Sequence, residues 1–217
     1  MSNIEVLSNG RITLKNDKLK IIEGDSEEYQ ILVNCANKVK NLDGATIEFG
    51  VRLGLSSILI MNENVNKIHI SVDPYGSIEY SDDKHGTFKT DYSNNLRNRC
   101  LYAIYKWVYE NNANLLFFIL EDTDFFARFE HGIPIYNNNK KILTEYSLVH
   151  FDGPHTTEAV NKELDFFIDK RMQIGGIMVF DDIDLYNHDL IEKRIIDTQN
   201  YEIFQKGKRK AAYIKIK

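Results

Sequence analysis

The sequence predicts an α/β fold: a doubly wound sheet of five parallel strands, followed by an antiparallel hairpin at its C-terminal end. From residue 45 onward, short runs rich in Ile, Val, Leu and Phe alternate with helical segments. Several of these runs are almost continuously apolar, which is typical of parallel strands covered on both faces. The last two runs are separated by a short basic turn that leaves no room for a crossover helix, so we expect them to pair antiparallel.

Length and charge limit the class of protein. The chain has 217 residues, which fits a single domain with a sizeable core, and we expect residues 1–43 to form a small hairpin and helix beside a core at 44–217. The net charge of −5 argues against nucleic acid as the main partner. The sequence has neither the apolar segment of a signal peptide nor a run approaching the ~18 apolar residues that span a membrane. We therefore expect a cytoplasmic protein without a membrane partner, and the sequence carries no signal for its oligomeric state.

Near the N-terminus, two elements are expected before the core begins. The pair Asn9-Gly10 separates two runs of alternating apolar residues, which is a strong hairpin signal. A helix is predicted over 25–41, with Asp25 as its cap and Glu28 completing a capping-box-like pattern.

The core elements follow in order. Strands are predicted at 45–50, 67–73, 115–120, 146–152 and 176–182; helices at 55–64, 94–111, 157–172 and 189–200; and the closing hairpin at 201–207 and 211–217. Residues 74–93 and 130–145 show no regular pattern, and loops of that length are usually functional lids or disordered. A basic run lies in the last hairpin turn, which we expect either to be solvated or to touch an anionic ligand: Lys206, Lys208, Arg209 and Lys210.

Glycine or acidic residues follow all five predicted parallel strands. Because ligands bind outside the carboxyl ends of such strands, this joint placement indicates a binding site. The residues are Gly50 and Gly54 after the first strand, Asp73 after the second, Asp122 and Thr123 after the third, Asp152 after the fourth, and Asp181 and Asp182 after the fifth. The glycine turn matches neither GxGxxG nor a phosphate-binding GK[ST] loop, which disfavours a dinucleotide fingerprint and a P-loop.

These segments resemble a class I S-adenosylmethionine-dependent methyltransferase with a Rossmann-like fold. The resemblance covers residues 44–217 and rests on TIEFGVRLGLSS, ISVDP, FFILEDT, LVHFDGPH, GGIMVFDDI and the closing hairpin. It is strongest toward small O-methyltransferases of the catechol, caffeoyl-CoA and macrocin kinds. It implies S-adenosylmethionine as cofactor and a small hydroxylated acceptor, such as a sugar.

The resemblance also implies roles for individual residues. Those implied to bind the cofactor are Glu48, Gly50, Gly54 and Ser56 around its methionine part, Asp73 at the ribose, Asp122 and Thr123 near the adenine, and Asp152. Asp152, Asp181 and Asp182 fall where metal-dependent members place their divalent-ion ligands. Two departures stand out: EDT at 121–123 lacks the glycine usual there, and His155 stands where catechol-type enzymes keep a lysine.

Three carboxylates held close together repel each other unless a cation neutralises them. Mg²⁺ or Mn²⁺ would do so through oxygen ligands, would orient an acceptor hydroxyl and would lower its pKa. His155 would be the proton acceptor and, with Asp152, a candidate catalytic residue.

Three other interpretations remain open at this point. The first is a methyltransferase that uses no metal. The second is a metal-dependent glycosyltransferase that uses the pattern Asp182-x-Asp184. The third is a cofactor-binding relative without catalytic activity, since fold similarity alone does not establish an enzyme.

Overall fold

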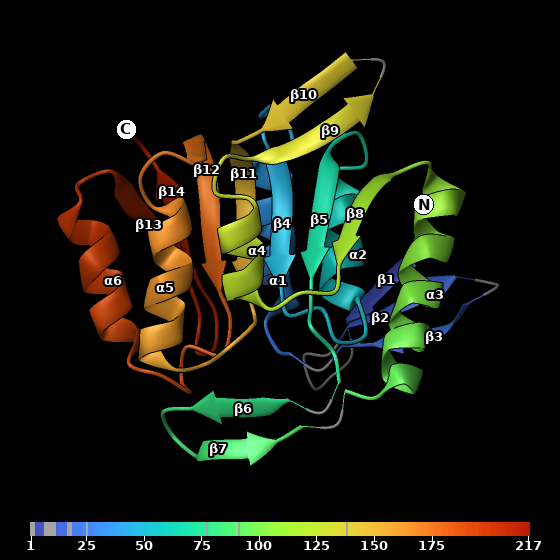
Figure 1. The fold of residues 1–217 in the computed structure, drawn as a ribbon, viewed down its shortest axis with the longest axis horizontal. Coiled ribbons are helices and arrows are strands. Elements are labelled where there is room, and N and C mark those ends of the chain that lie inside the picture. Colours follow the sequence, from blue (N-terminus) through green and yellow to red (C-terminus); the bar gives the residue numbers. More distant parts are fainter. Residues whose placement is uncertain are drawn as a thin grey trace.

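The computed structural model describes residues 3–6, 12–16, 19–24, 26–76, 78–90, 92–137 and 139–217. A seven-stranded sheet with the order β13-β14-β12-β11-β4-β5-β8 forms its centre (Figure 1). The parallel strands are β4 (Ala45–Phe49), β5 (Ile68–Val72), β8 (Asn114–Phe118), β11 (Tyr146–Phe151) and β12 (Met172–Phe180), and the hairpin is β13 (Tyr201–Lys206) with β14 (Ala211–Lys215). The predicted fold is confirmed.

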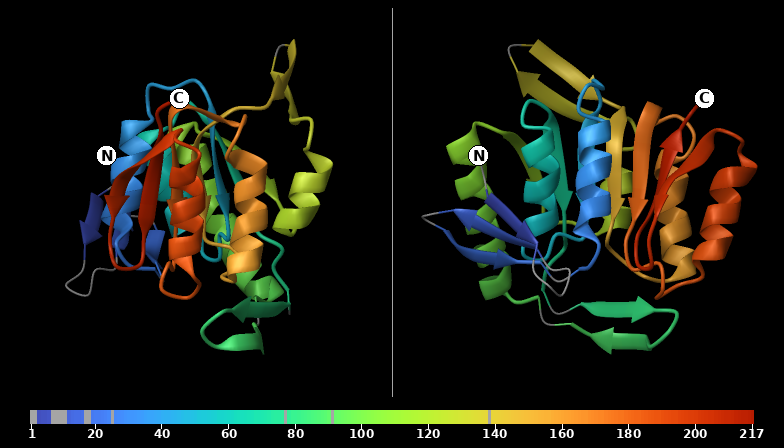
Figure 2. Two further views of the ribbon diagram at one scale, coloured as in Figure 1. Left: turned by 90° about the vertical axis from the view of Figure 1, so that its left-hand side faces the viewer. Right: turned by 180° about the vertical axis from the view of Figure 1, so that it is seen from behind.

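Helices cover both faces of the sheet, as Figures 1 and 2 show. One face carries α1 (Tyr29–Lys38), α2 (Leu55–Glu63) and α3 (Asn94–Asn111), and the other carries α4 (Asp122–Arg128), α5 (Thr157–Phe167) and α6 (His188–Asp197). Each face has its own hydrophobic cluster. Every residue of β4 and β11 is buried, which is why these strands are almost continuously apolar.

The predicted cap of α1 is wrong for Glu28, and Asp25 lies outside the described residues. The helix begins at Tyr29, and Glu28 has a left-handed φ of 55°. The Glu28 carboxylate instead accepts the backbone N–H groups of Lys208, Arg209 and Lys210, at 3.0, 2.9 and 3.1 Å. Three converging donors in the turn of the C-terminal hairpin hold a carboxylate better than one donor at a helix start.

Two hairpins occupy the stretches that had no predicted structure. β6 (Glu79–Asp82) pairs with β7 (Gly86–Lys89) beyond the carboxyl ends of the parallel strands. β9 (Ile133–Asn137) pairs with β10 (Asn139–Leu143) beyond their opposite ends (Figure 1). β7 and most of β10 are exposed, and these two strands show no apolar alternation.

The N-terminal segment forms a three-stranded antiparallel sheet. β1 (Asn3–Val6) pairs with β2 (Ile12–Asn16) as predicted, but the turn at Asn9-Gly10 lies outside the described residues. The third strand, β3 (Leu19–Glu23), was not predicted. No helix in the described part of the chain is long and apolar enough to cross a membrane.

The start of β12 also differs from the prediction. The strand begins at Met172 rather than 176, and α5 ends earlier, at Phe167. The register between β11 and β12 shifts before Leu148, and Gly175, with a φ of 81°, lies in the irregular part. A glycine pair inside a strand marks such a bulge, but in the sequence it resembles a strand boundary.

Candidate active site

A cavity of about 530 Å³ opens where β4, β5, β11 and β12 end. The β6–β7 hairpin contributes to its wall through Tyr80 and Phe88. Among its lining residues are these predicted site residues: Gly50, Asp73, Asp122, Asp152, His155 and Asp182. The other predicted residues do not line it: Glu48, Gly54, Ser56, Thr123 and Asp181. The structure therefore brings one part of the predicted set together around a common space.

The turn after β4 depends on two glycines that serve different purposes. A side chain at Gly50, whose φ is 80°, would collide with the backbone carbonyl of Asp152, so the chain ends of β4 and β11 can meet only with glycine here. A side chain at Gly54 would collide with Ile104 of α3. Gly50 thus shapes the cavity, whereas Gly54 allows α2 and α3 to pack closely.

Asp73 fixes this turn from the end of β5. Its Oδ2 accepts the N–H groups of Val51 and Arg52, at 2.8 and 2.9 Å, and its Oδ1 accepts that of Tyr75 at 2.9 Å. Burial raises the pKa of Asp73, and the three backbone hydrogen bonds oppose this effect. Because a carboxylate has about four acceptor positions, one remains for a ligand hydroxyl in the cavity.

Glu48 belongs to a buried polar network rather than to the cavity wall. Its carboxylate is fully buried, lies 2.7 Å from Nδ1 of His150 and accepts the hydroxyl of Ser57. Burial alone would lower the pKa of His150, but its contacts with Asp181 and Glu48 raise it. His150 was not among the predicted site residues. It lies on β11, two residues before the strand-end acid Asp152, and this position beside the acid is the signal that could have identified it.

His155 is a buried residue of the cavity wall, just before α5. Thr156 caps this helix by accepting the N–H of Ala159 at 3.2 Å. The Nδ1 atom of His155 contacts the Tyr80 hydroxyl, and Nε2 has no hydrogen-bond partner, lying 3.7 Å from Oδ1 of Asp152. Burial lowers the pKa of His155 to about 4, so the ring is neutral at physiological pH.

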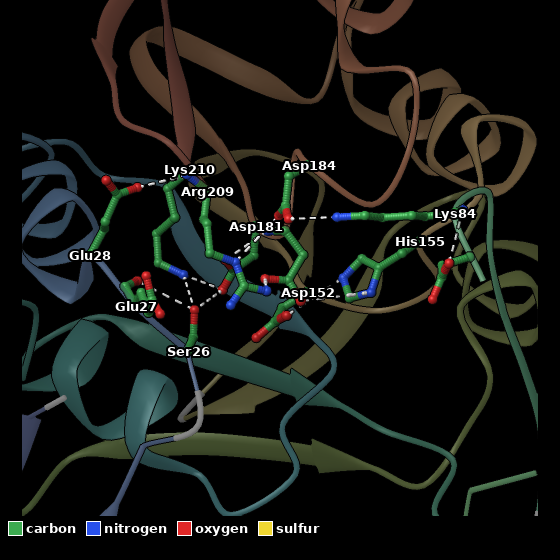
Figure 3. Close-up of polar contacts among 12 residues, drawn as sticks. Ser26, Glu27, Glu28, Lys84, Asp152, His155, Asp181, Asp184, Arg209 and Lys210 are labelled. Atoms are coloured by element: carbon green, nitrogen blue, oxygen red, sulfur yellow. Dashed lines mark hydrogen bonds and ion pairs between the residues drawn. The ribbon is translucent and has the colours of Figure 1, made fainter. Parts of the chain in front are cut away.

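The carboxylates after β12 face two cations from the C-terminal hairpin, as the close-up in Figure 3 shows. Lys210 is fully buried and its ammonium binds Asp181, while the guanidinium of Arg209 binds Asp182. Burial alone would raise the pKa of Asp181, but Lys210 and His150 outweigh it and hold that pKa well below its usual range. The basic run is therefore not a solvated tip: part of it neutralises the strand-end acids.

The donor atoms of this region would be close enough for a metal ion. One ligand atom from each of His150, Asp152 and Asp181, and likewise from Asp152, His155 and Asp182, lies within 4.8 Å of the others. The predicted triad nevertheless does not fit a divalent ion, because the charges of Asp181 and Asp182 are already balanced by Lys210 and Arg209.

Comparison with known proteins shows the family of the chain. A family model described as a methyltransferase domain matches residues 47–183, more than half of the chain, and the chain belongs to this family. The predicted resemblance to class I S-adenosylmethionine-dependent methyltransferases is thus confirmed, and with it the expectation of an enzyme.

Solved structures share the fold at low sequence identity. An O-methyltransferase from Bacillus cereus in complex with S-adenosylhomocysteine is 11% identical, with a TM-score of 0.56 over 89% of this chain and 83% of that one. A calicheamicin methyltransferase is 14% identical, with a TM-score of 0.54 over 87% and 78%. An rRNA methylase from Streptococcus thermophilus is 8% identical, with a TM-score of 0.53 over 89% and 99%. No curated protein matches the sequence.

Proposed function

We propose that this methyltransferase transfers the methyl group of S-adenosylmethionine to a hydroxyl oxygen of a small acceptor. The observation that carries the proposal is the cavity itself, which is lined by Gly50 and Asp73 and also by His155, whose buried Nε2 has no hydrogen-bond partner. The acceptor oxygen would attack the methyl carbon, the C–S bond would break, and S-adenosylhomocysteine would leave. The proton of the hydroxyl would pass to the histidine.

The cofactor is assigned to the side of the cavity formed by β4, β5 and β8. Gly50 allows a ligand to approach the backbone, and Asp73 offers an acceptor for ribose hydroxyls. Asp122, at the start of α4, lines the same side and is proposed to lie near the adenine. The complex of the Bacillus cereus relative with S-adenosylhomocysteine supports this choice of cofactor.

Proton removal is assigned to His155. The Tyr80 hydroxyl occupies Nδ1, so a ring that carries its proton on Nδ1 presents a free acceptor at Nε2. A pKa near 4 keeps that acceptor unprotonated at working pH. The ring is then a weak base, which suits a reaction whose sulfonium leaving group is already activated.

The acceptor is proposed to be a small hydroxylated molecule rather than RNA. The cavity is lined by five acidic side chains in addition to Asp73: Glu79, Glu121, Asp122, Asp152 and Asp182. Asp182 is paired with Arg209, and Arg52 also lines the cavity, but acidic side chains still outnumber basic ones in its wall. This excess of negative charge opposes a phosphate backbone, and the net charge of −5 acts in the same direction. Among the neighbours, the calicheamicin enzyme is a TDP-rhamnose O-methyltransferase, which supports a sugar.

The glycosyltransferase interpretation loses its basis in the structure. Asp182 and Asp184 both contact Arg209, so the D-x-D pattern is held by a protein cation. The family match also covers this segment up to residue 183. Methyl transfer is therefore the function that the site supports best.

The test has two stages. Calorimetry should show S-adenosylhomocysteine binding to the wild type and weaker binding to Asp73→Asn. Labelled S-adenosylmethionine should then be incubated with a panel of sugars, phenols and structured RNA, and methylated products identified by mass spectrometry. Methylation of RNA alone would contradict the proposed acceptor class, and absence of cofactor binding would contradict the function as a whole.

A further inference from the structure

We propose that the Lys210 ammonium, supported by the Arg209 guanidinium, is the built-in cation of the strand-end carboxylate cluster, and that this methyltransferase works without a divalent metal. The cation site rests on the structure, and the metal-free reaction rests on the proposed function. The position where the sequence predicts a metal would thus be taken by side chains of the protein.

Lys210 is held on all sides in a way that suits a permanent charge. It is 0% exposed, and its Nζ donates to Asp181 and, at 2.6 Å, to the hydroxyl of Ser26. The same ammonium lies 5.4 Å from the centroid of the Tyr29 ring, within cation–π range. If a metal ion bound the Asp181 carboxylate, the buried ammonium of Lys210 would be left without a counter-charge. Such a loss in general costs several kcal/mol.

Asp181 has little capacity left for a metal. Its Oδ2 accepts from Lys210 and, at 2.8 Å, from Ser26, and lies 3.7 Å from Nε2 of His150. Its Oδ1 accepts the backbone N–H of Asp182 at 2.8 Å. Both oxygens of this 1% exposed carboxylate are therefore engaged by protein donors.

Arg209 completes the charge balance on the solvent side. Its NH2 group binds Asp182, and its Nε lies 3.3 Å from Asp184, which also lies 3.6 Å from Lys84. Two cations thus stand against Asp181 and Asp182, and a divalent ion would add two further positive charges beside them. The repulsion opposes metal binding even where the oxygen atoms are close enough to coordinate.

The backbone that carries both cations is itself fixed. The Glu28 carboxylate accepts the N–H groups of residues 208–210, and Gly207 donates to the carbonyl of Lys210 at 2.7 Å. Figure 3 shows Glu28, Lys210 and Ser26 gathered on one side of Asp181. The backbone positions from which Arg209 and Lys210 reach the carboxylates are therefore fixed by other parts of the protein.

The experiment measures Mn²⁺ binding to the full chain by electron paramagnetic resonance, using the loss of the free-ion signal. We expect the wild type not to bind Mn²⁺ in the micromolar range. Lys210→Met should bind it at least roughly tenfold more tightly, because it removes a like charge next to three carboxylates. Lys208→Met is the matched control: it removes the same charge from an exposed position in the same turn and should behave like the wild type.

Loss of Lys210 alone leaves Asp181 buried without a counter-charge, so a second variant is included. Lys210→Met combined with Asp181→Asn removes both charges, and it should fold, as judged by circular dichroism, and bind no Mn²⁺. Micromolar binding by the wild type that disappears in Asp181→Asn would overturn the proposal.

A parallel titration separates this proposal from the proposed function. S-adenosylhomocysteine is titrated into the wild type in EDTA and again with Mg²⁺, and equal affinities are expected. An affinity that rises at least tenfold with Mg²⁺ would count against the built-in cation. Absence of S-adenosylhomocysteine binding under both conditions would refute the proposed function, while the Mn²⁺ titration would still decide the cation site.

Discussion

At the scale of single residues, His155 is the side chain on which the proposed chemistry depends most. In the metal-free reaction that we propose, removal of the proton from the acceptor hydroxyl falls to a side chain, and we assign it to Nε2 of His155, which lines the cavity. Tyr80 and Tyr186 position the ring: the first contacts Nδ1, and the second lies parallel to it, with 6.4 Å between ring centroids.

His155→Ala is expected to reduce kcat by roughly 10²–10⁴, the usual contribution of a general base, with little change in cofactor affinity. Since burial lowers the pKa of His155 to about 4, the wild-type rate should stay level between pH 8 and 6 and fall only as the pH approaches 4. Rates across pH 4–8, measured with whichever acceptor the panel identifies, check both statements. A variant within threefold of the wild type would show that the histidine is structural.

Asp73→Asn is expected to weaken S-adenosylhomocysteine binding by roughly 1.5–3 kcal/mol, the usual loss for a hydrogen bond to a charged group. The asparagine keeps the shape of the side chain but loses its negative charge. It also has only one acceptor oxygen, whereas the N–H groups of Val51 and Arg52 both donate to Oδ2 of Asp73 in the wild type. Calorimetry measures the affinity, and thermal unfolding without ligand separates a binding defect from a loosened turn. Unchanged affinity would exclude Asp73 from the cofactor site.

His69 should make the fold sensitive to acid. His69 lies on β5, the strand between β4 and β8; its ring is fully buried, and its Nδ1 lies 2.9 Å from the Thr46 hydroxyl. Burial lowers the pKa of His69 from 6.5 to about 4; the charge of Glu48 opposes this shift, and that of His150 adds to it. Below pH 6.5 the unfolded chain therefore binds the proton more readily. The stability that the neutral ring contributes is complete above pH 6.5 and is lost as the pH falls toward 4.

The free energy of unfolding of the wild type should therefore fall by about 2–3 kcal/mol between pH 7 and 4.5 because of His69, since each pKa unit is worth about 1.4 kcal/mol. Urea unfolding of wild type and His69→Asn at both pH values checks it. The variant should be less stable at pH 7 and should show a correspondingly smaller loss on acidification. An equal loss in both proteins would assign the acid sensitivity to other groups.

At the scale of elements, the C-terminal hairpin depends on α1 as much as on its own strands. Glu28, just before that helix, binds three backbone N–H groups of the β13–β14 turn, and this turn delivers Arg209 and Lys210 to the site. The hairpin is thus positioned by a residue far away in the sequence.

Glu28→Ala is expected to destabilise the protein by about 1–3 kcal/mol, because three backbone donors of the turn lose their acceptor, two of them part-buried. Glu27→Ala, one position earlier and exposed, is the matched control and should change stability by less than about 0.5 kcal/mol. Urea unfolding measures both. Equal effects of the two substitutions would mean that the Glu28 contacts contribute nothing to the fold.

At the scale of the whole molecule, the sequence predicts those features that depend on burial and on strand polarity. The five parallel strands could be found because both of their faces are covered, and the acids Asp73, Asp152 and Asp182 could be placed together because parallel strands end at one edge. The β6–β7 hairpin could not be predicted, because β7 is exposed along its whole length and carries no apolar alternation.

The partners of the acidic cluster escaped prediction for a different reason. Lys210 lies 29 residues after Asp181 and 184 after Ser26, so no local pattern connects them. The sequence shows that three carboxylates need a cation, and Mg²⁺ is one answer. It does not show that a lysine from the closing hairpin reaches the same place.

Ligand binding should stabilise the molecule as a unit. With S-adenosylhomocysteine at 100 times its dissociation constant, stability should rise by about 2.7 kcal/mol, which corresponds to roughly 5–10 °C in Tm for a chain of this size. Differential scanning calorimetry should show one transition before and after addition, because we propose that the whole chain is one domain. Two separate transitions would contradict that proposal.

The place of β14 between β12 and β13 has a consequence for synthesis on the ribosome. Until residues 211–215 have emerged and inserted, β12 presents an open edge with Met178 and Phe180, and Asp181 has no lysine beside it. An open apolar edge is a template for pairing with another chain. Nascent chains stalled before this point should therefore be the species that aggregates, and the acidic cluster acquires its counter-charge in the same event that closes the sheet.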